Sequence, residues 1–237
     1  MKILAIETAT DACSAALLLN QDLAVEYQLA PRQHTQLILP MVEKLLAQAQ
    51  LGLSELDAIA FGCGPGAFTG LRIAAGVTQG LALAADLPVI PVSTLAAMAQ
   101  QAWQQYQMPH ILVALDARIG EVYWGQYLIE NNRAALQGWE QVIKPDQLDK
   151  TPVQDWLAVG SGWEVYADSL QQKVQGKLMR VDSQITPSAE FVAQLAKQDY
   201  QQGKLLPAEQ AQPVYLRNKV ADTIKEREAK ERGVAKP

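Results

Sequence analysis

The sequence predicts an α/β protein built from two similar halves, each a meander of strands followed by helices and further strands. Residues 56–61 are apolar with β-branched and aromatic members, which is typical of a buried strand. Residues 71–85 are rich in Ala, Leu and Ile without Pro, which favours a helix. A similar series of strands begins again at residue 111. This restart indicates an internal duplication of one α/β unit.

Two pairs of matching segments support the duplication. An acidic residue ends the first strand of each half, Glu7 in one and Asp116 in the other. A later strand ends in Gly-Cys-Gly at 62–64 and in Gly-Ser-Gly at 160–162. We therefore expect two α/β subdomains of related structure.

The predicted elements follow the chain in order. The strands of the first half are expected at 2–8, 13–19, 23–30, 56–61 and 87–92, and its helices at 34–50, at 71–85 and from Ser93 or Thr94 to about 106. The strands of the second half are expected at 111–115, 122–129, 136–143 and 178–181, and a helix at 187–202. Candidate N-caps are Thr69, Ser93 or Thr94, and Thr186 or Ser188. Pro40 predicts a kink or a later start of the first helix.

These elements divide the chain into a first subdomain at 1–107, a second at 108–217 and a tail at 218–237. The tail is highly charged and has few apolar residues, so it cannot contribute to a packed core. Its positive and negative charges are mixed, which favours a solvated tail over an RNA-binding segment.

Composition limits the classes of function. The chain has 237 residues, a net charge of -5 and a pI near 5.1, which disfavours binding of nucleic acid by this chain alone. Its apolar runs are shorter than the roughly 20 residues of a membrane helix, and Glu7 interrupts the one nearest the N-terminus. The two cysteines, Cys13 and Cys63, are expected to be reduced thiols in the cytoplasm.

The glycine turn at 62–70 has two interpretations. Backbone N–H groups at a helix N-terminus attract anions, and Thr8, Thr10, Gly64 and Gly66 are the candidate contacts of such a site. The spacing matches neither a P-loop nor a dinucleotide-binding motif. A tight strand-to-helix turn with close packing of the helix is the favoured interpretation.

Other catalytic patterns are weak. The chain contains two histidines, His34 and His110, without the spacing of a metal-binding pair, and both cysteines are expected to be buried and inert. Glu7 and Asp116 could act as a pair of carboxylates if the two halves face one another. We predict no catalytic residue and no metal site in this chain.

Several sequence motifs, taken together, indicate the protein family more specifically than these candidate sites do. They are the opening Met-Lys-Ile-Leu-Ala-Ile-Glu-Thr-Ala-Thr, His-Thr-Gln at 34–36, Gly-Pro-Gly-Ala-Phe-Thr-Gly-Leu-Arg at 64–72, Pro-Val-Ser-Thr-Leu at 91–95, Asp-Ala-Arg at 116–118 and Pro-Val-Tyr-Leu-Arg at 213–217. In these motifs the chain resembles the TsaB (YeaZ) family over nearly its whole length. The resemblance implies two ribonuclease-H-like subdomains of the actin and sugar-kinase (ASKHA) ATPase-like fold.

The resemblance also implies a function. TsaB proteins are partner subunits in the bacterial synthesis of threonylcarbamoyladenosine (t6A), at N6 of adenosine 37 in tRNAs that read ANN codons. The implied partners are a TsaD-like catalytic paralogue, a TsaE-like ATPase and a second copy of the chain, with tRNA reached through the complex. ATP and a metal are expected in the partner subunits rather than here.

The paralogue TsaD holds its metal with two histidines, and the matching positions in this chain are Thr94 and Met98. The resemblance therefore implies a non-catalytic scaffold. The alternative is an ATP-dependent small-molecule enzyme of the kinase-like fold. The absence of glycine from the first hairpin turn at 8–11 counts against this alternative, because that turn usually carries glycine in such kinases.

The resemblance also places the partner contact on two helices, 34–50 and 68–85, whose apolar and small residues exceed what one core-facing stripe needs. The residues predicted to lie at this contact are Leu37, Ile38, Met41, Leu45, Leu71, Ala75 and Thr78. The alternative is that these side chains face the sheet of their own chain.

Overall fold

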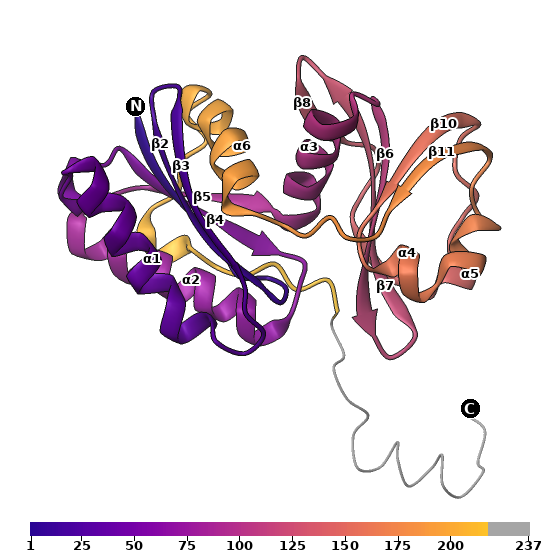
Figure 1. The fold of residues 1–237 in the computed structure, drawn as a ribbon, viewed down its shortest axis with the longest axis horizontal. Coiled ribbons are helices and arrows are strands. Elements are labelled where there is room, and N and C mark those ends of the chain that lie inside the picture. Colours follow the sequence, from indigo (N-terminus) through magenta and orange to yellow (C-terminus); the bar gives the residue numbers. More distant parts are fainter. Residues whose placement is uncertain (218–237) are drawn as a thin grey trace, which may run out of the picture.

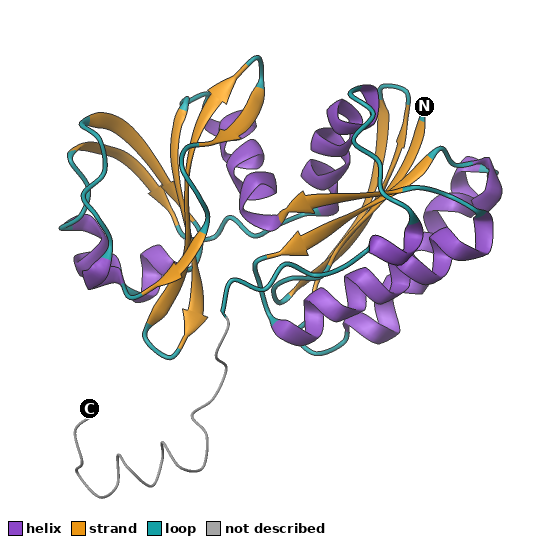
Figure 2. Cartoon of the chain, turned by 180° about the vertical axis from the view of Figure 1, so that it is seen from behind, coloured by secondary structure: helices purple, strands orange, loops and turns teal. Residues whose placement is uncertain are grey.

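The computed structural model of the chain describes residues 1–217, and the predicted tail at 218–237 lies outside these residues. The described chain forms two lobes, each built on its own sheet (Figure 1). In each lobe the strands form one sheet, and helices lie against its faces, as Figure 2 shows from behind. None of the helices at 1–217 is long and apolar enough to span a membrane.

The sheet of the first lobe has five strands in the order β3-β2-β1-β4-β5. They are β1 (Lys2–Glu7), β2 (Ala12–Leu19), β3 (Asp22–Leu29), β4 (Ala58–Gly64) and β5 (Val89–Ser93). The first three strands pair antiparallel, which confirms the predicted meander, and β4 and β5 continue the sheet in parallel with β1.

The sheet of the second lobe repeats this order as β8-β7-β6-β10-β11. Its strands are β6 (His110–Arg118), β7 (Glu121–Glu130), β8 (Arg133–Leu136), β9 (Gln141–Ile143), β10 (Gln154–Val159) and β11 (Gly176–Asp182). Here too, three antiparallel strands precede two parallel ones, so the predicted duplication is confirmed. The single strand expected at 136–143 is wrong, because the chain turns at Gly138 (φ +81°) and β8 and β9 pair with different parts of β7.

Helices cover both faces of the first sheet. Helices α1 (His34–Ala49) and α2 (Phe68–Ala85) pack on one face, and α6 (Ala189–Gln201) packs on the other. Successive residues of β1 alternate between these two layers, with Leu4 and Ile6 beneath α1 and α2 and Ile3 and Ala5 beneath α6. The strand is apolar from Ile3 to Ile6 because both of its faces are buried.

The second sheet is covered by α3 (Thr94–Tyr106) on one face and by the short α4 (Gly162–Val165) and α5 (Ala167–Gln171) on the other. Short 3₁₀ turns occur at Leu53–Glu55, Pro145–Gln147 and Ala208–Gln210. Helix α3 follows the strands of the first lobe but packs on the second, and α6 follows the second sheet but packs on the first. The division of the chain into subdomains at residue 107 stays a prediction. One helix from each side of this division packs on the sheet of the other side.

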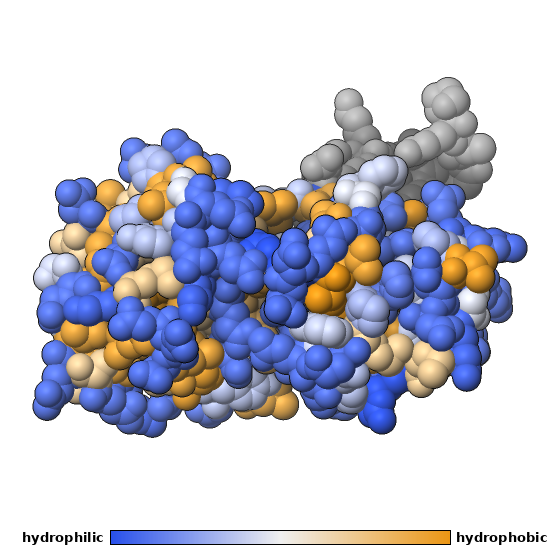
Figure 3. All heavy atoms as spheres, turned by 90° about the horizontal axis from the view of Figure 1, so that it is seen from above, coloured by the Kyte–Doolittle hydropathy of each residue, from blue (hydrophilic) through white to orange (hydrophobic). Residues whose placement is uncertain are grey.

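Helices α3 and α6 lie side by side between the sheets (Figure 1). The face of the molecule over the upper ends of these helices is largely hydrophilic (Figure 3). Gln104 of α3 and Gln194 of α6 are hydrogen-bonded to each other. This end of the junction between the lobes is therefore polar, whereas the lower end encloses a cleft.

The helix starts test the predicted caps. Ser93 caps α3 by accepting a hydrogen bond from Ala96 N–H at 3.1 Å, and Ser188 caps α6, so both predictions are confirmed. The prediction for Thr69 is wrong, because α2 begins at Phe68 with Ala67 at the N-cap. Helix α1 begins at His34 with Pro40 inside it, so the later start is wrong too.

Candidate functional site

The glycine turn joins β4 to α2 and packs against the turn between β1 and β2. Cβ atoms added at Gly66 and Gly70 would lie 2.6 Å from Ala9 O and 2.0 Å from Thr8 O. The N–H of Ala67, at the N-cap, donates to Ala9 O at 2.7 Å. The glycines therefore allow two backbone segments to touch, which confirms the packing interpretation of this turn.

The four predicted anion contacts are not arranged around one open space. The Thr8 hydroxyl is buried and donates to Gly70 O at 2.7 Å, so its prediction as an anion contact is wrong. Gly64 has φ +117°, and Val214 O would lie 2.7 Å from a Cβ added there. Thr10 and Gly66 do line a cleft, and an anion site at these two residues stays a prediction.

This cleft, of about 620 Å³, lies between the two lobes. The first lobe contributes the β1–β2 turn, the start of α2 and the end of β3. The second contributes the end of β6, Tyr123 of β7, Ser161 and the end of α4. Residues 183–186 and 214–217 complete the lining. The cleft therefore depends on how the lobes are held relative to one another.

Charged groups in the cleft are largely engaged with each other. The Arg118 guanidinium lies 3.1 Å from the Asp116 carboxylate, and the Tyr166 hydroxyl donates to Asp116 Oδ1 at 3.2 Å. Arg217 forms an ion pair with Glu121. Both arginines of the cleft are thus paired with carboxylates, and an anionic ligand would have to compete for them.

The suggested pair of Glu7 and Asp116 does not form at the cleft. Glu7 is fully buried, accepting hydrogen bonds from Ala9 N–H at 2.7 Å and the Thr94 hydroxyl at 3.2 Å, whereas Asp116 lines the cleft. Burial raises the pKa of the Glu7 carboxyl from 4.5 to about 7, although these hydrogen bonds act in the opposite direction. Glu7 therefore joins the β1–β2 turn to the start of α3.

A second carboxylate holds the same helix start. Glu140, in the loop before β9, accepts hydrogen bonds from the Ser93 and Tyr127 hydroxyls. Burial raises the pKa of the Glu140 carboxyl, against the effect of these two donors. The first residues of α3 thus lie between Glu7 and Glu140, near the positive end of the helix dipole.

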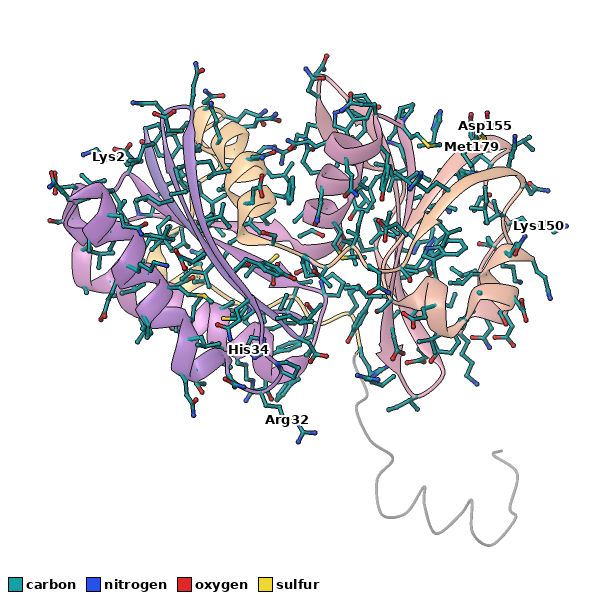
Figure 4. The ribbon with its side chains drawn as sticks, viewed as in Figure 1. Lys2, Arg32, His34, Lys150, Asp155 and Met179 are labelled. Atoms are coloured by element: carbon teal, nitrogen blue, oxygen red, sulfur yellow. The ribbon has the colours of Figure 1, made fainter. Side chains whose placement is uncertain are left out.

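The positions that match the histidines of TsaD have structural roles here. The Thr94 hydroxyl is buried against Glu7, and Met98 is fully buried in the core between α3 and the second sheet. His34 Nε2 lies 2.8 Å from Thr10 O, so this side chain is engaged with the β1–β2 turn. Arg32, which precedes it, points away from the protein (Figure 4). Within residues 1–217, no group of three or more His, Cys, Asp or Glu side chains is arranged to hold a metal ion.

Both cysteines are buried and unpaired. Cys63 lies in β4 rather than in the glycine turn, which corrects its predicted place. Burial raises the pKa of the Cys13 thiol to about 11 and that of the Cys63 thiol to about 12. We expect a maleimide at pH 8 to label the folded chain at least about 100-fold more slowly than the chain in urea, because the reactive thiolate is scarce and covered. Equal labelling rates would contradict this burial.

The predicted partner-contact residues are mostly core residues. Six of the seven are buried by their own chain, namely Ile38, Met41, Leu45, Leu71, Ala75 and Thr78, and Leu37 is half-buried. The burial of these six favours the alternative that they face the sheet of their own chain, and their place near a partner contact stays a prediction. Apolar residues occupy both sides of α1 and α2, so their spacing alone did not distinguish the inner side from the outer.

The outer sides of α1 and α2 expose a different set of residues. Leu39 of α1 and Leu83 of α2 are exposed, and Cβ atoms added at Gly76 and Gly80 would meet nothing within 4 Å. We call these four residues and their surroundings the outer helical face. Because Gly76 and Gly80 have no side chain, another helix could approach this face closely.

An aromatic cluster begins this face, and sequence reasoning missed it. The Arg72 guanidinium lies 4.0 Å from the centroid of the Phe68 ring, and the Phe68 and Tyr215 rings are 5.4 Å apart. Phe68 and Tyr215 are 49% and 42% exposed. Phe68 and Tyr215 each belong to one of the motifs on which the family resemblance rests. Their place in these motifs could have identified them as candidate surface residues.

Two lobes with the same strand order, facing each other across a cleft, define the class as the ASKHA-like fold of actin and sugar kinases. The chain belongs, within this class, to the TsaB (YeaZ) family. It is 44% identical to the tRNA threonylcarbamoyladenosine biosynthesis protein TsaB of Escherichia coli K12, over 93% of this chain and 96% of that protein. The protein of the same name from Haemophilus influenzae is 40% identical over 93% and 95%.

A solved structure and a family model agree with this assignment. YeaZ from Pseudomonas aeruginosa superposes with a TM-score of 0.84 at 42% identity, covering 91% of this chain and 99% of that one. The family model described as "TsaD: tRNA N6-adenosine threonylcarbamoyltransferase" matches residues 24–225. The match to this model agrees with the relationship to TsaD that the sequence motifs indicated.

Proposed function

We propose that this chain is a non-catalytic partner subunit in the synthesis of t6A at adenosine 37 of tRNAs that read ANN codons. It would bind a TsaD-like catalytic paralogue, act with a TsaE-like ATPase and reach tRNA through the complex. The observation that carries the proposal is the match of nearly the whole chain to proteins named for tRNA threonylcarbamoyladenosine biosynthesis. We further propose a cytoplasmic location, with ATP and the metal held by the partners.

The local chemistry supports a scaffold over a kinase-like enzyme. The β1–β2 turn, where such kinases hold phosphate, is in contact with the start of α2 through Ala67 and Gly70. The arginines of the cleft are paired with Asp116 and Glu121. The presence of a cleft between the lobes favours the alternative, an ATP-dependent small-molecule enzyme. ATP turnover by the isolated full-length chain would support this enzyme instead of the scaffold.

The outer helical face is the surface we propose for the catalytic paralogue and, in its absence, for a second copy of this chain. Gly76→Trp should abolish or strongly weaken both complexes, because the indole would occupy the space that a partner helix needs. The fold should be retained, because nothing lies within 4 Å of the added Cβ and Trp favours a helix more than Gly does. Ala75→Trp would not be a clean test, because Ala75 is buried.

The measurement is light scattering after size exclusion, on the chain alone and mixed with the catalytic paralogue. Gln105→Trp, at an exposed position of α3, adds the same side chain away from the face and is the matched control. Loss of the complex only in Gly76→Trp would support the proposed surface. A complex that forms equally well with both variants would place the contact elsewhere, and no complex with the unchanged chain would remove the proposed function.

A further inference from the structure

A short segment near the end of the described chain passes from one lobe to the other. We call residues 213–217 the strap. The strap leaves the first lobe beyond the 3₁₀ turn Ala208–Gln210 and runs to the start of β7 (Figure 1, yellow). Its residues 214–217 line the cleft between the lobes. The strap is therefore placed to influence how widely the cleft opens.

The strap is attached to the first lobe through its middle. Val214 N–H donates to Cys63 O, near the end of β4, at 2.7 Å. Arg72 Nε donates to the Tyr215 hydroxyl at 3.2 Å, and the Tyr215 ring packs beside Phe68. Backbone and side-chain contacts thus fix this part of the strap to β4 and to the start of α2.

The end of the strap is attached to the second lobe through one side chain. Arg217 donates through Nε to Glu121 Oε2 at 3.1 Å and through a terminal nitrogen to Ala117 O at 3.0 Å, and it forms an ion pair with Glu121. The Arg217 side chain is only 15% exposed. A partly buried guanidinium with several acceptors is held more firmly than a surface ion pair.

A second connection joins the lobes far from the strap. Arg133 of β8 makes two hydrogen bonds to the Asp199 carboxylate of α6, at 3.0 and 2.8 Å, and a third to Leu195 O at 2.9 Å. Asp199 is buried, and α6 belongs by its packing to the first lobe. The lobes are thus joined at the α6–β8 contact and at Ser93 and Glu140 beside the start of α3. At the cleft they are joined again by the strap and by the Tyr123 hydroxyl, which donates to Gly66 O at 3.4 Å.

From this arrangement we infer that the strap is a latch that sets the separation of the two lobes. Arg217 is its releasable end, because one side chain provides the ion pair and the hydrogen bonds to Glu121 and Ala117. When Arg217 is released, the connection through Arg133 and Asp199 remains, and the lobes rotate about it so that the cleft opens. Domain closure about a few fixed contacts is a common form of such motion.

The test measures the distance between the lobes directly. Spin labels are placed on the full-length chain at Gln48→Cys of α1 and Lys150→Cys in the second lobe, two exposed positions. The buried thiols of Cys13 and Cys63 leave these sites as the reactive ones. Double electron–electron resonance then gives the distribution of distances between the labels.

Arg217→Gln should shift this distribution to longer distances and widen it, with an unchanged circular dichroism spectrum. Arg118→Gln is the matched control, because Arg118 is nearby but its ion pair with Asp116 stays within the second lobe. The exchange of charges in Arg217→Glu with Glu121→Arg should restore most of the narrow distribution. A distribution that is the same for the parent chain and Arg217→Gln would overturn the inference, as would an equal shift in Arg118→Gln.

Discussion

Glu7→Gln is expected to make the chain more stable relative to the parent as the pH rises from about 4.5 to 8. The folded state raises the pKa of Glu7 from 4.5 to about 7, so over this range the unfolded chain loses its proton first. Deprotonation therefore favours unfolding of the parent chain, and the cost stops growing above the folded pKa. Glutamine does not titrate, so the difference in the free energy of unfolding should grow by about 3 kcal/mol over this range.

Urea unfolding of both chains at several pH values measures this difference. Thr94→Val provides a second variant, because it removes a hydroxyl that donates to Glu7 Oε2 and lowers the pKa. Without this hydroxyl the pKa of Glu7 in the folded state should rise further. The free energy of unfolding of this variant should therefore continue to fall up to a higher pH than in the parent chain. If the difference between Glu7→Gln and the parent did not change with pH, the buried carboxyl would not carry the raised pKa.

Gly70→Ala is expected to destabilise the fold by about 3 kcal/mol or more, which is large for one methyl group. The added Cβ would lie 2.0 Å from Thr8 O, and backbone atoms cannot move aside as a flexible side chain can. The hydrogen bond from the Thr8 hydroxyl to Gly70 O would be strained by the same displacement. The β1–β2 turn and the start of α2 would therefore have to separate.

Gly80→Ala in the same helix is the control for Gly70→Ala. Nothing lies within 4 Å of a Cβ at Gly80, so the change should stabilise the chain by roughly 0.5–1 kcal/mol through helix propensity. Denaturant titrations of the two variants measure both effects. Equal changes in stability would show that the contact between Gly70 and Thr8 does not limit the packing of the fold.

The local elements were largely predictable because they depend on neighbours in the sequence. The duplicated order of strands follows from two runs of similar patterns, and the caps at Ser93 and Ser188 follow from a hydroxyl placed before a helix. The close packing at the glycine turn was also predictable, because several glycines in a short strand-to-helix turn indicate a backbone that side chains would obstruct. The N-cap of α2 was wrongly predicted at Thr69 instead of Ala67 because helix starts shift by one or two residues with little change in the pattern.

The partner-contact residues could not be selected from the sequence. Ile38 and Leu39 are neighbours of similar hydrophobicity, yet one is buried and the other is 43% exposed. The direction that each faces depends on how α1 and α2 rest on the sheet. Burial in the assembled lobe, rather than hydrophobicity, therefore decides which residues remain available to a partner.

By itself, the sequence determined the family, the duplicated α/β units and the glycine turn, because each is encoded in contiguous residues. The tertiary structure alone decided the exchange of α3 and α6 between the lobes, the burial of Glu7 beside Thr94, and the ion pairs Arg133–Asp199 and Arg217–Glu121. The partners in these pairs are 66 and 96 residues apart in the chain. Their charges have no local pattern, and they meet only because the two lobes are packed against each other.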